Sequence, residues 1–170
     1  MSEIISPDNT ELLTYVLGEI HNKLYIDVVR DLKQQTEQKL ESGELEPAEF
    51  PITHHFSDGV YMRQMDASAG TFCVSKMHRT EHQNILLKGA LTIITEDGLV
   101  YLEAPQVIKS KPGTMRVGYF HQDTTWITIH PTHETDLAAI EREVIVPDEE
   151  IEQFLASIGH EPKEILLCHG

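Results

Sequence analysis

Two histidines and a lysine lie close together in one short stretch of the chain. The stretch 70–89 reads GTFCVSKMHRTEHQNILLKG and contains Lys76, His78 and His82. Because side chains alternate along an extended strand, Val74, Lys76 and His78 are expected on one face, with His82 returning to that face after a turn. Ring nitrogens can bind a divalent metal, whereas N–H groups and a lysine charge can bind an anion. These groups could therefore hold a metal, bind an anion, or be polar side chains of a hairpin without a binding role.

Residues 46–131, which contain this stretch, have the pattern of a small all-β unit. Short runs rich in β-branched and aromatic residues alternate with turn sequences such as SDG at 57–59, EDG at 96–98 and KPG at 111–113. Strands of this length and spacing indicate a sandwich or a barrel. No helical pattern interrupts them, which disfavours a parallel βαβ sheet. We expect residues 60–130 to be overwhelmingly β, with Gly89 and Gly98 at turns.

The two flanking segments, 1–45 and 132–170, are expected to be helical. In the first, apolar residues recur at steps of three and four and form one stripe along a helix. The stripe consists of Leu13, Leu17, Ile20, Leu24, Val28 and Leu32. Such a stripe packs either on the barrel or on a second subunit, so we expect a homo-oligomer, most simply a dimer. The second segment is expected to form short helices that pack on the barrel.

Composition limits the partners and the compartment. The formal net charge is −15, and a field of this sign repels phosphate backbones and anionic lipid, so we expect no nucleic-acid and no membrane partner. The first residues show neither a basic region nor an apolar one, so no signal peptide is expected. Cys73 and Cys168 lie too far apart in the sequence to suggest a metal-binding pair. A cytoplasmic location follows as the expectation.

Residues ~70–116 resemble the cupins. The family's first motif sets two histidines and a glutamate between two glycines, and here Gly70 and Gly89 match that frame. Pro112 and Gly113 match the turn of the second motif. The resemblance implies a mainly β fold of the cupin type, a double-stranded β-helix or small jelly-roll barrel, with flanking N- and C-terminal α-helices. The wider pattern is similar to small cupin-like proteins of tailed-bacteriophage genomes, which implies the cytoplasm of a bacterial host.

The resemblance also implies where the site lies and how it departs from the family. At the four metal-ligand positions of the family, this chain has Lys76, His78, His82 and Arg116. Arginine has no lone pair to offer a metal, and lysine is a poor ligand. If the register holds, all four side chains converge in the interior of the barrel, where such folds hold one small ligand.

Three readings of the site remain open. In the first, Lys76 and Arg116 bind a phosphate or a carboxylate, and His78 and His82 add further hydrogen-bond donors. The protein would then capture a small, anionic molecule.

In the second reading, His78 and His82 bind Fe, Mn, Ni or Zn, and a third ligand comes from Glu81, His121 or His130. The protein would then be a metal-dependent oxygenase or isomerase. In the third, the polar groups satisfy one another inside an inactive barrel, and the protein is a phage accessory or structural protein without catalytic activity. Fold alone does not choose among these functions.

Overall fold

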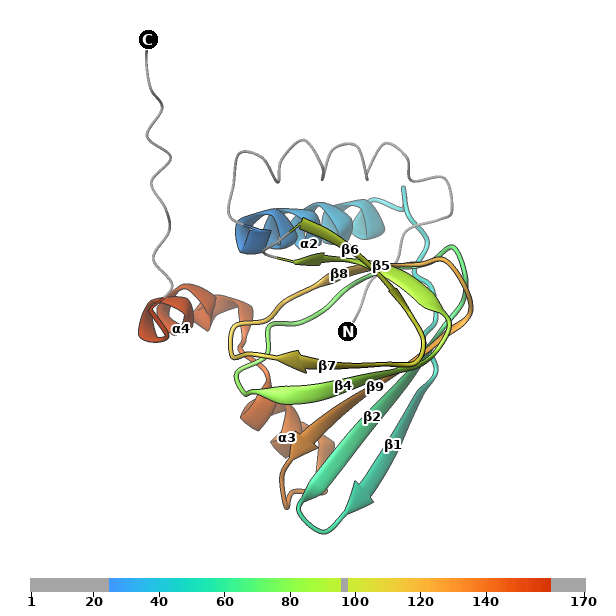
Figure 1. Cartoon of the computed structure of the whole chain (residues 1–170). Helices are drawn as coiled ribbons and strands as arrows, with labels where there is room; N and C mark the ends of the chain where they lie inside the picture. Colours follow the sequence, from blue (N-terminus) through green and yellow to red (C-terminus); the bar gives the residue numbers. More distant parts are fainter. Residues whose placement is uncertain (1–24, 96–97, 160–170) are drawn as a thin grey trace.

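The computed structural model describes residues 25–95 and 98–159, and within them nine strands form two antiparallel sheets (Figure 1). The first sheet has the order β1 (Ile52–Ser57), β2 (Val60–Ala67), β9 (Thr124–Pro131), β4 (His82–Lys88) and β7 (Gln106–Ser110). The second has the order β3 (Phe72–Val74), β8 (Val117–Phe120), β5 (Ala90–Thr95) and β6 (Gly98–Glu103). The predicted mainly β, cupin-type barrel with flanking helices is confirmed.

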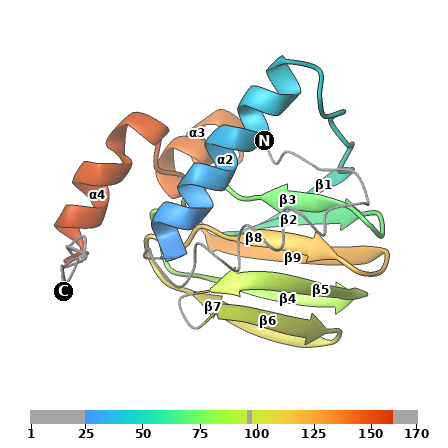
Figure 2. The same cartoon turned by 90° about the horizontal axis from the view of Figure 1, so that it is seen from above.

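Helix α2 (Tyr25–Glu41) covers the outer face of the four-stranded sheet (Figure 2). Its buried residues Ile26, Val29 and Leu32 pack in one cluster with Phe72 and Val74 of β3. The sheet is therefore covered on both faces, which explains why β3 carries buried residues without alternation. Of the predicted apolar stripe, Val28 and Leu32 are buried here, and the other members lie outside the described residues. The homo-oligomer stays a prediction.

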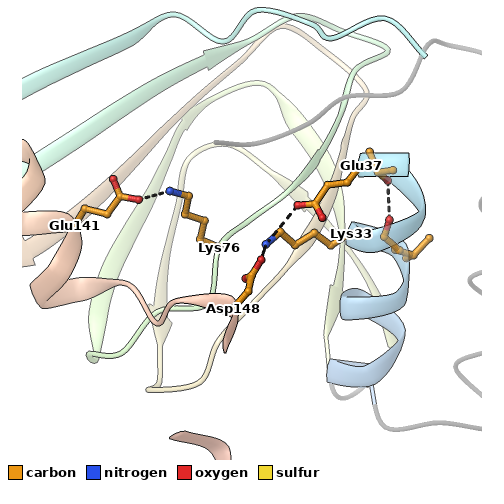
Figure 3. Close-up of polar contacts among 7 residues, drawn as sticks. Lys33, Glu37, Lys76, Glu141 and Asp148 are labelled. Carbon is orange, nitrogen blue, oxygen red and sulfur yellow. Dashed lines mark hydrogen bonds and ion pairs between the residues drawn. The ribbon is translucent and has the colours of Figure 1, made fainter. Parts of the chain in front are cut away.

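The C-terminal segment forms α3 (Leu137–Val144), a 3₁₀ turn (Asp148–Glu150) and α4 (Ile151–Ser157). Asp136 caps α3, because its carboxylate accepts a hydrogen bond from the Ala139 N–H at 2.8 Å. An ion pair between Lys33 of α2 and Asp148 ties the two helical segments together (Figure 3). In the part of the chain that the structure describes, no helix combines the length and apolar character needed to cross a membrane.

One local prediction about the strands is wrong. The strand expected to run through Lys76 and His78 ends at Val74, whose side chain packs toward α2 rather than into the barrel. Beyond it the backbone is held by separate hydrogen bonds, from the Ser75 N–H to the Arg116 carbonyl at 2.8 Å and from the His78 N–H to the Thr114 carbonyl at 3.0 Å. Strand alternation therefore does not extend to residues 76 and 78.

The predicted turn at Gly89 is present and requires glycine. Its φ is +88°, and a Cβ added there would lie 2.5 Å from the carbonyl oxygen of Asp123. Gly43, which follows α2, has a φ of +76° but no atom within 4 Å of an added Cβ. Both glycines thus have a left-handed backbone, but only at Gly89 would a side chain clash with neighbouring atoms.

We predict that Gly89→Ala lowers the free energy of unfolding more than Gly43→Ala does. The left-handed backbone should cost roughly 1–2 kcal/mol at either position, and the clash with the Asp123 backbone adds to this only at Gly89. Urea unfolding of both variants measures the difference. Equal losses would contradict the close approach at Gly89.

Candidate functional site

A cavity of about 330 Å³ lies between the two sheets, at the end of the barrel that α3 covers. Lys76, His78, His82 and Arg116, the four predicted site residues, all line it. The β4 strand supplies His82, while the others come from the irregular segments before β4 and β8. The structure thus brings the four side chains together, although not through one continuous strand.

Three histidine rings gather at this end of the cavity. The ring centroids of His78 and His82 are 4.3 Å apart, those of His82 and His130 4.8 Å, and those of His78 and His130 5.6 Å. His130 is on β9, which pairs with β4, so the register of these two strands places it beside His82. The sequence alone suggested His130 only as one of three possible third ligands.

Burial shifts these histidines toward their neutral forms. It lowers the pKa of His78 well below its ordinary range, and the neighbouring His82, His130 and Arg116 lower it further. Burial, then His82 and Arg63, lower the pKa of His130 to about 4. Burial also lowers the pKa of His82, against a hydrogen bond to the Thr80 carbonyl that raises it. The three rings are therefore neutral at pH 7, and each has a lone pair.

Hydrogen bonds indicate which ring nitrogen of His82 carries its proton. His82 Nδ1 lies 3.0 Å from the Thr80 carbonyl oxygen. Because a carbonyl only accepts, Nδ1 carries the proton and Nε2 of His82 carries the lone pair. Nδ1 of His130 is buried and has no hydrogen-bond partner among the described residues, which is costly unless a bound molecule supplies one.

A hydrogen-bonded network holds Arg116 at the cavity wall. Its guanidinium donates to Ser110 Oγ at 2.6 Å, and the same oxygen accepts from Asn84 Nδ2 at 2.7 Å. Asn84 Oδ1 in turn accepts from Trp126 Nε1 and from Thr128 Oγ1, both at 3.2 Å. These side chains come from four strands or their ends, so the network fixes Arg116 relative to both sheets.

The cations of the cavity differ in whether their charge is neutralised. Lys76 forms an ion pair with Glu141 of α3 (Figure 3), and its side chain is 37% exposed. Arg116 is only partly exposed, and within residues 25–95 and 98–159 no carboxylate lies at ion-pair distance from it. The same holds for Arg63 of β2, which also lines the cavity and which the sequence reasoning missed. The sequence signal for Arg63 was its position two residues from Tyr61 and from Met65, two large side chains that are both buried, because residues two apart on a strand face the same side.

The predicted metal ligands are only partly assembled. Glu81 is paired with Lys109 at the surface, at 2.9 Å, and His121 is bonded to Thr92 at 2.7 Å outside the cavity, so neither can complete a site with His78. Among the residues that the structure describes, no group of three or more histidine, cysteine, aspartate or glutamate side chains is placed to hold a metal ion. The three rings are close, but their arrangement does not fit a formed metal site.

Comparison with known proteins finds similar structures for about half of the chain. No protein-family model matches the sequence, and no curated protein does. Solved structures similar to the chain include a protein assigned to ethanolamine utilization (EutQ) from Salmonella typhimurium, at 13% identity and a TM-score of 0.45, over 52% of this chain and 74% of that one. A cupin-2 domain protein from Shewanella frigidimarina matches at 13% identity and 0.42, over 54% and 90%.

A third similar structure is an acetylacetone dioxygenase from Acinetobacter johnsonii, at 17% identity and a TM-score of 0.40, over 48% of this chain and 58% of that enzyme. Cupin-domain proteins are among the similar structures. This chain is cupin-like in fold, and its origin in a phage stays a prediction.

We predict that stability falls as the pH is lowered from 7 toward 4, and that His130→Gln reduces this fall. The folded-state pKa of His130, about 4, lies below the ordinary value of about 6.5. Between these values the unfolded chain binds more protons than the folded one, so the free energy of unfolding decreases with falling pH. One such histidine contributes up to about 1.4 kcal/mol per pH unit. Urea unfolding in EDTA between pH 7 and 4.5 measures the slope.

His133→Gln is the matched control, because the side chain of His133 is 83% exposed and lies outside the cavity. It should leave the slope as in the wild-type protein. A slope unchanged in His130→Gln would show that burial does not hold this ring neutral.

Proposed function

We propose that this cupin-like protein binds a small anionic molecule in its barrel, with Arg116 as the principal contact. The observation that carries the proposal is the partly buried guanidinium of Arg116, which faces the cavity without a carboxylate partner among the described residues. An uncompensated charge removed from water is costly. A bound carboxylate or phosphate would compensate it and could accept two parallel hydrogen bonds from the guanidinium.

The histidines can serve the same anion. The centroids of the three rings lie 4.3–5.6 Å apart at the cavity wall. His82 already donates its Nδ1–H to the Thr80 carbonyl, so it can donate to an anion only through a protonated Nε2. A bound negative charge favours their protonated forms, so it would raise the lowered pKa values and convert lone pairs into further donors. Lys76 contributes less than the sequence predicted, because Glu141 already neutralises it.

We predict that Arg116→Met abolishes anion binding while the fold remains. Losing a buried, hydrogen-bonded charge contact should cost about 2–5 kcal/mol of binding free energy. Arg116 is a partly buried charge without a carboxylate partner among the described residues, so replacing it by an apolar side chain should leave the free energy of unfolding equal or higher. Calorimetric titration with benzoate, and separately with inorganic phosphate, measures binding, and urea unfolding measures stability.

Arg79→Met is the control, since Arg79 pairs with Glu150 at 3.0 Å and does not line the cavity. It should retain the wild-type affinity. Retained affinity in Arg116→Met, or a loss of stability large enough to unfold it, would assign Arg116 a structural role and contradict the proposal.

A metal-dependent oxygenase or isomerase is the second candidate function. The unpartnered buried Nδ1 of His130 favours it, together with the lone pair on Nε2 of His82. Against it stand the absence of a formed ligand group among the described residues and the positive charge of Arg116 near the rings of His78 and His82.

We predict that metal analysis separates the candidates. Protein purified without added metals or chelators should contain no stoichiometric Fe, Mn, Ni or Zn, and anion affinity should increase from pH 8 to pH 5.5 because binding takes up protons on the histidines. Metal affinity should instead decrease from pH 8 to pH 5.5, since protons compete with the metal for the ring nitrogens. Stoichiometric metal that is lost in His78→Ala and His82→Ala, but kept in Arg116→Met, would replace the anion proposal by the metal one.

The third alternative, a phage accessory or structural protein without catalytic activity, would be favoured if neither anion nor metal bound. A homodimer in the cytoplasm of a bacterial host is proposed from the sequence and the resemblance alone.

A further inference from the structure

The strand register divides the cavity into a polar end and an apolar end. In the five-stranded sheet, Tyr61 lies opposite His130 nearest α3. One layer further along β9, Thr128 lies between Arg63 and Asn84, and the layer beyond that places Trp126 between Met65 and Leu86. The two layers nearer α3 are therefore polar or charged and the third is apolar, because the inward-facing residues two apart on each strand change character only at that third layer.

The four-stranded sheet shows the same order. Arg116 is two residues before Gly118, which pairs with Cys73 and Ile93, and the next inward pair is Phe120 with Leu91. The apolar members from both sheets pack in one cluster. The cavity is thus a pocket with Arg116 and the histidines at one end and with Trp126, Leu91 and Phe120 at the other.

We propose that the ligand is an amphipathic monocarboxylate, with its carboxylate at Arg116 and an unbranched or aromatic apolar body directed toward Trp126, Leu91 and Phe120. This inference rests on the proposed anion-binding function and specifies the class of anion. A cavity of about 330 Å³ is at the small end of the range for small-molecule sites. Inorganic phosphate would leave the apolar end unfilled, so its binding should be weaker.

Gly118 sets the room available to the apolar body. It lies in the middle layer of the pocket wall and is buried. A Cβ added to it would lie 3.4 Å from Leu91 Cδ1, 3.9 Å from Ile93 Cγ2 and 4.0 Å from Phe120 Cζ, all ordinary contact distances. Its φ is not positive, so the backbone accepts other residues. A methyl group here would therefore fit at contact distance, and because Gly118 lines the cavity it would take up part of the pocket.

The test is a calorimetric titration with the straight-chain acids acetate, butanoate, hexanoate and octanoate, together with inorganic phosphate. The protein has a single tryptophan, Trp126, so its fluorescence reports whether the chain reaches the apolar end. Each added methylene should tighten binding about fourfold until the pocket is full. Gly118→Val should lower the ratio of hexanoate to acetate affinity at least tenfold, and Leu91→Ala should shift the preferred acid to a longer one.

Val107→Ala is the control, because Val107 is 71% exposed and does not line the cavity. It should keep the wild-type length profile. Gly118→Ala provides a smaller change in the same direction if the valine variant does not fold.

The outcomes distinguish a wrong class of ligand from the absence of an anion site. If Arg116→Met loses every acid but Gly118→Val keeps the wild-type length profile, the amphipathic ligand is refuted while the anion site stands. If Arg116→Met binds every acid like the wild-type protein, the anion site itself is refuted. Affinity that is independent of chain length, or phosphate binding as tight as that of the best acid, would likewise overturn the inference.

Discussion

The antiparallel pairing of β9 with both β2 and β4 is the constraint on which the site depends. This pairing places His130 beside His82 and Tyr61. Two residues earlier on β9, it places Thr128 between Arg63 and Asn84. A shift of one residue would turn every inward side chain of β9 to the outer face of the sheet. The network that orients Arg116 would then lose Trp126 and Thr128, and the histidine cluster would lose its third ring.

At the α3 end of the cavity, burial affects the histidines and Arg116 differently. Burial pushes the histidines toward their neutral forms, as the lowered pKa values of His78, His82 and His130 show. Arg116 cannot release its charge in the same way, because a guanidinium stays protonated in proteins. Its hydrogen bond to Ser110 compensates only part of the lost hydration, since a hydroxyl carries no net charge. Among the described residues, the positive charge without a carboxylate partner therefore lies on Arg116 and Arg63 and not on the histidines.

The fold was readable from local signals, and the details of the site were not. The turn glycines Gly89 and Gly98 and the short strands between them predicted the barrel, because these signals depend on neighbouring residues. Alternation failed at Lys76 because β3 ends at Val74, and alternation holds only within a strand. The role of His130, the cavity position of Arg63 and the pairing of Lys76 with Glu141 depend on contacts between distant segments, which spacing cannot show.

The charge distribution also bears on the size of the anion that can enter. The chain as a whole has a formal net charge of −15, so an approaching polyanion meets repulsion from the surface over its whole length. A small anion experiences this surface field only within about 8–10 Å at physiological salt. In the proposed site it would lie instead near Arg116 and Arg63, where the surroundings screen charge less than water does. If the barrel binds an anion as proposed, the acidic surface and the cationic cavity would together favour a single small anion over nucleic acid.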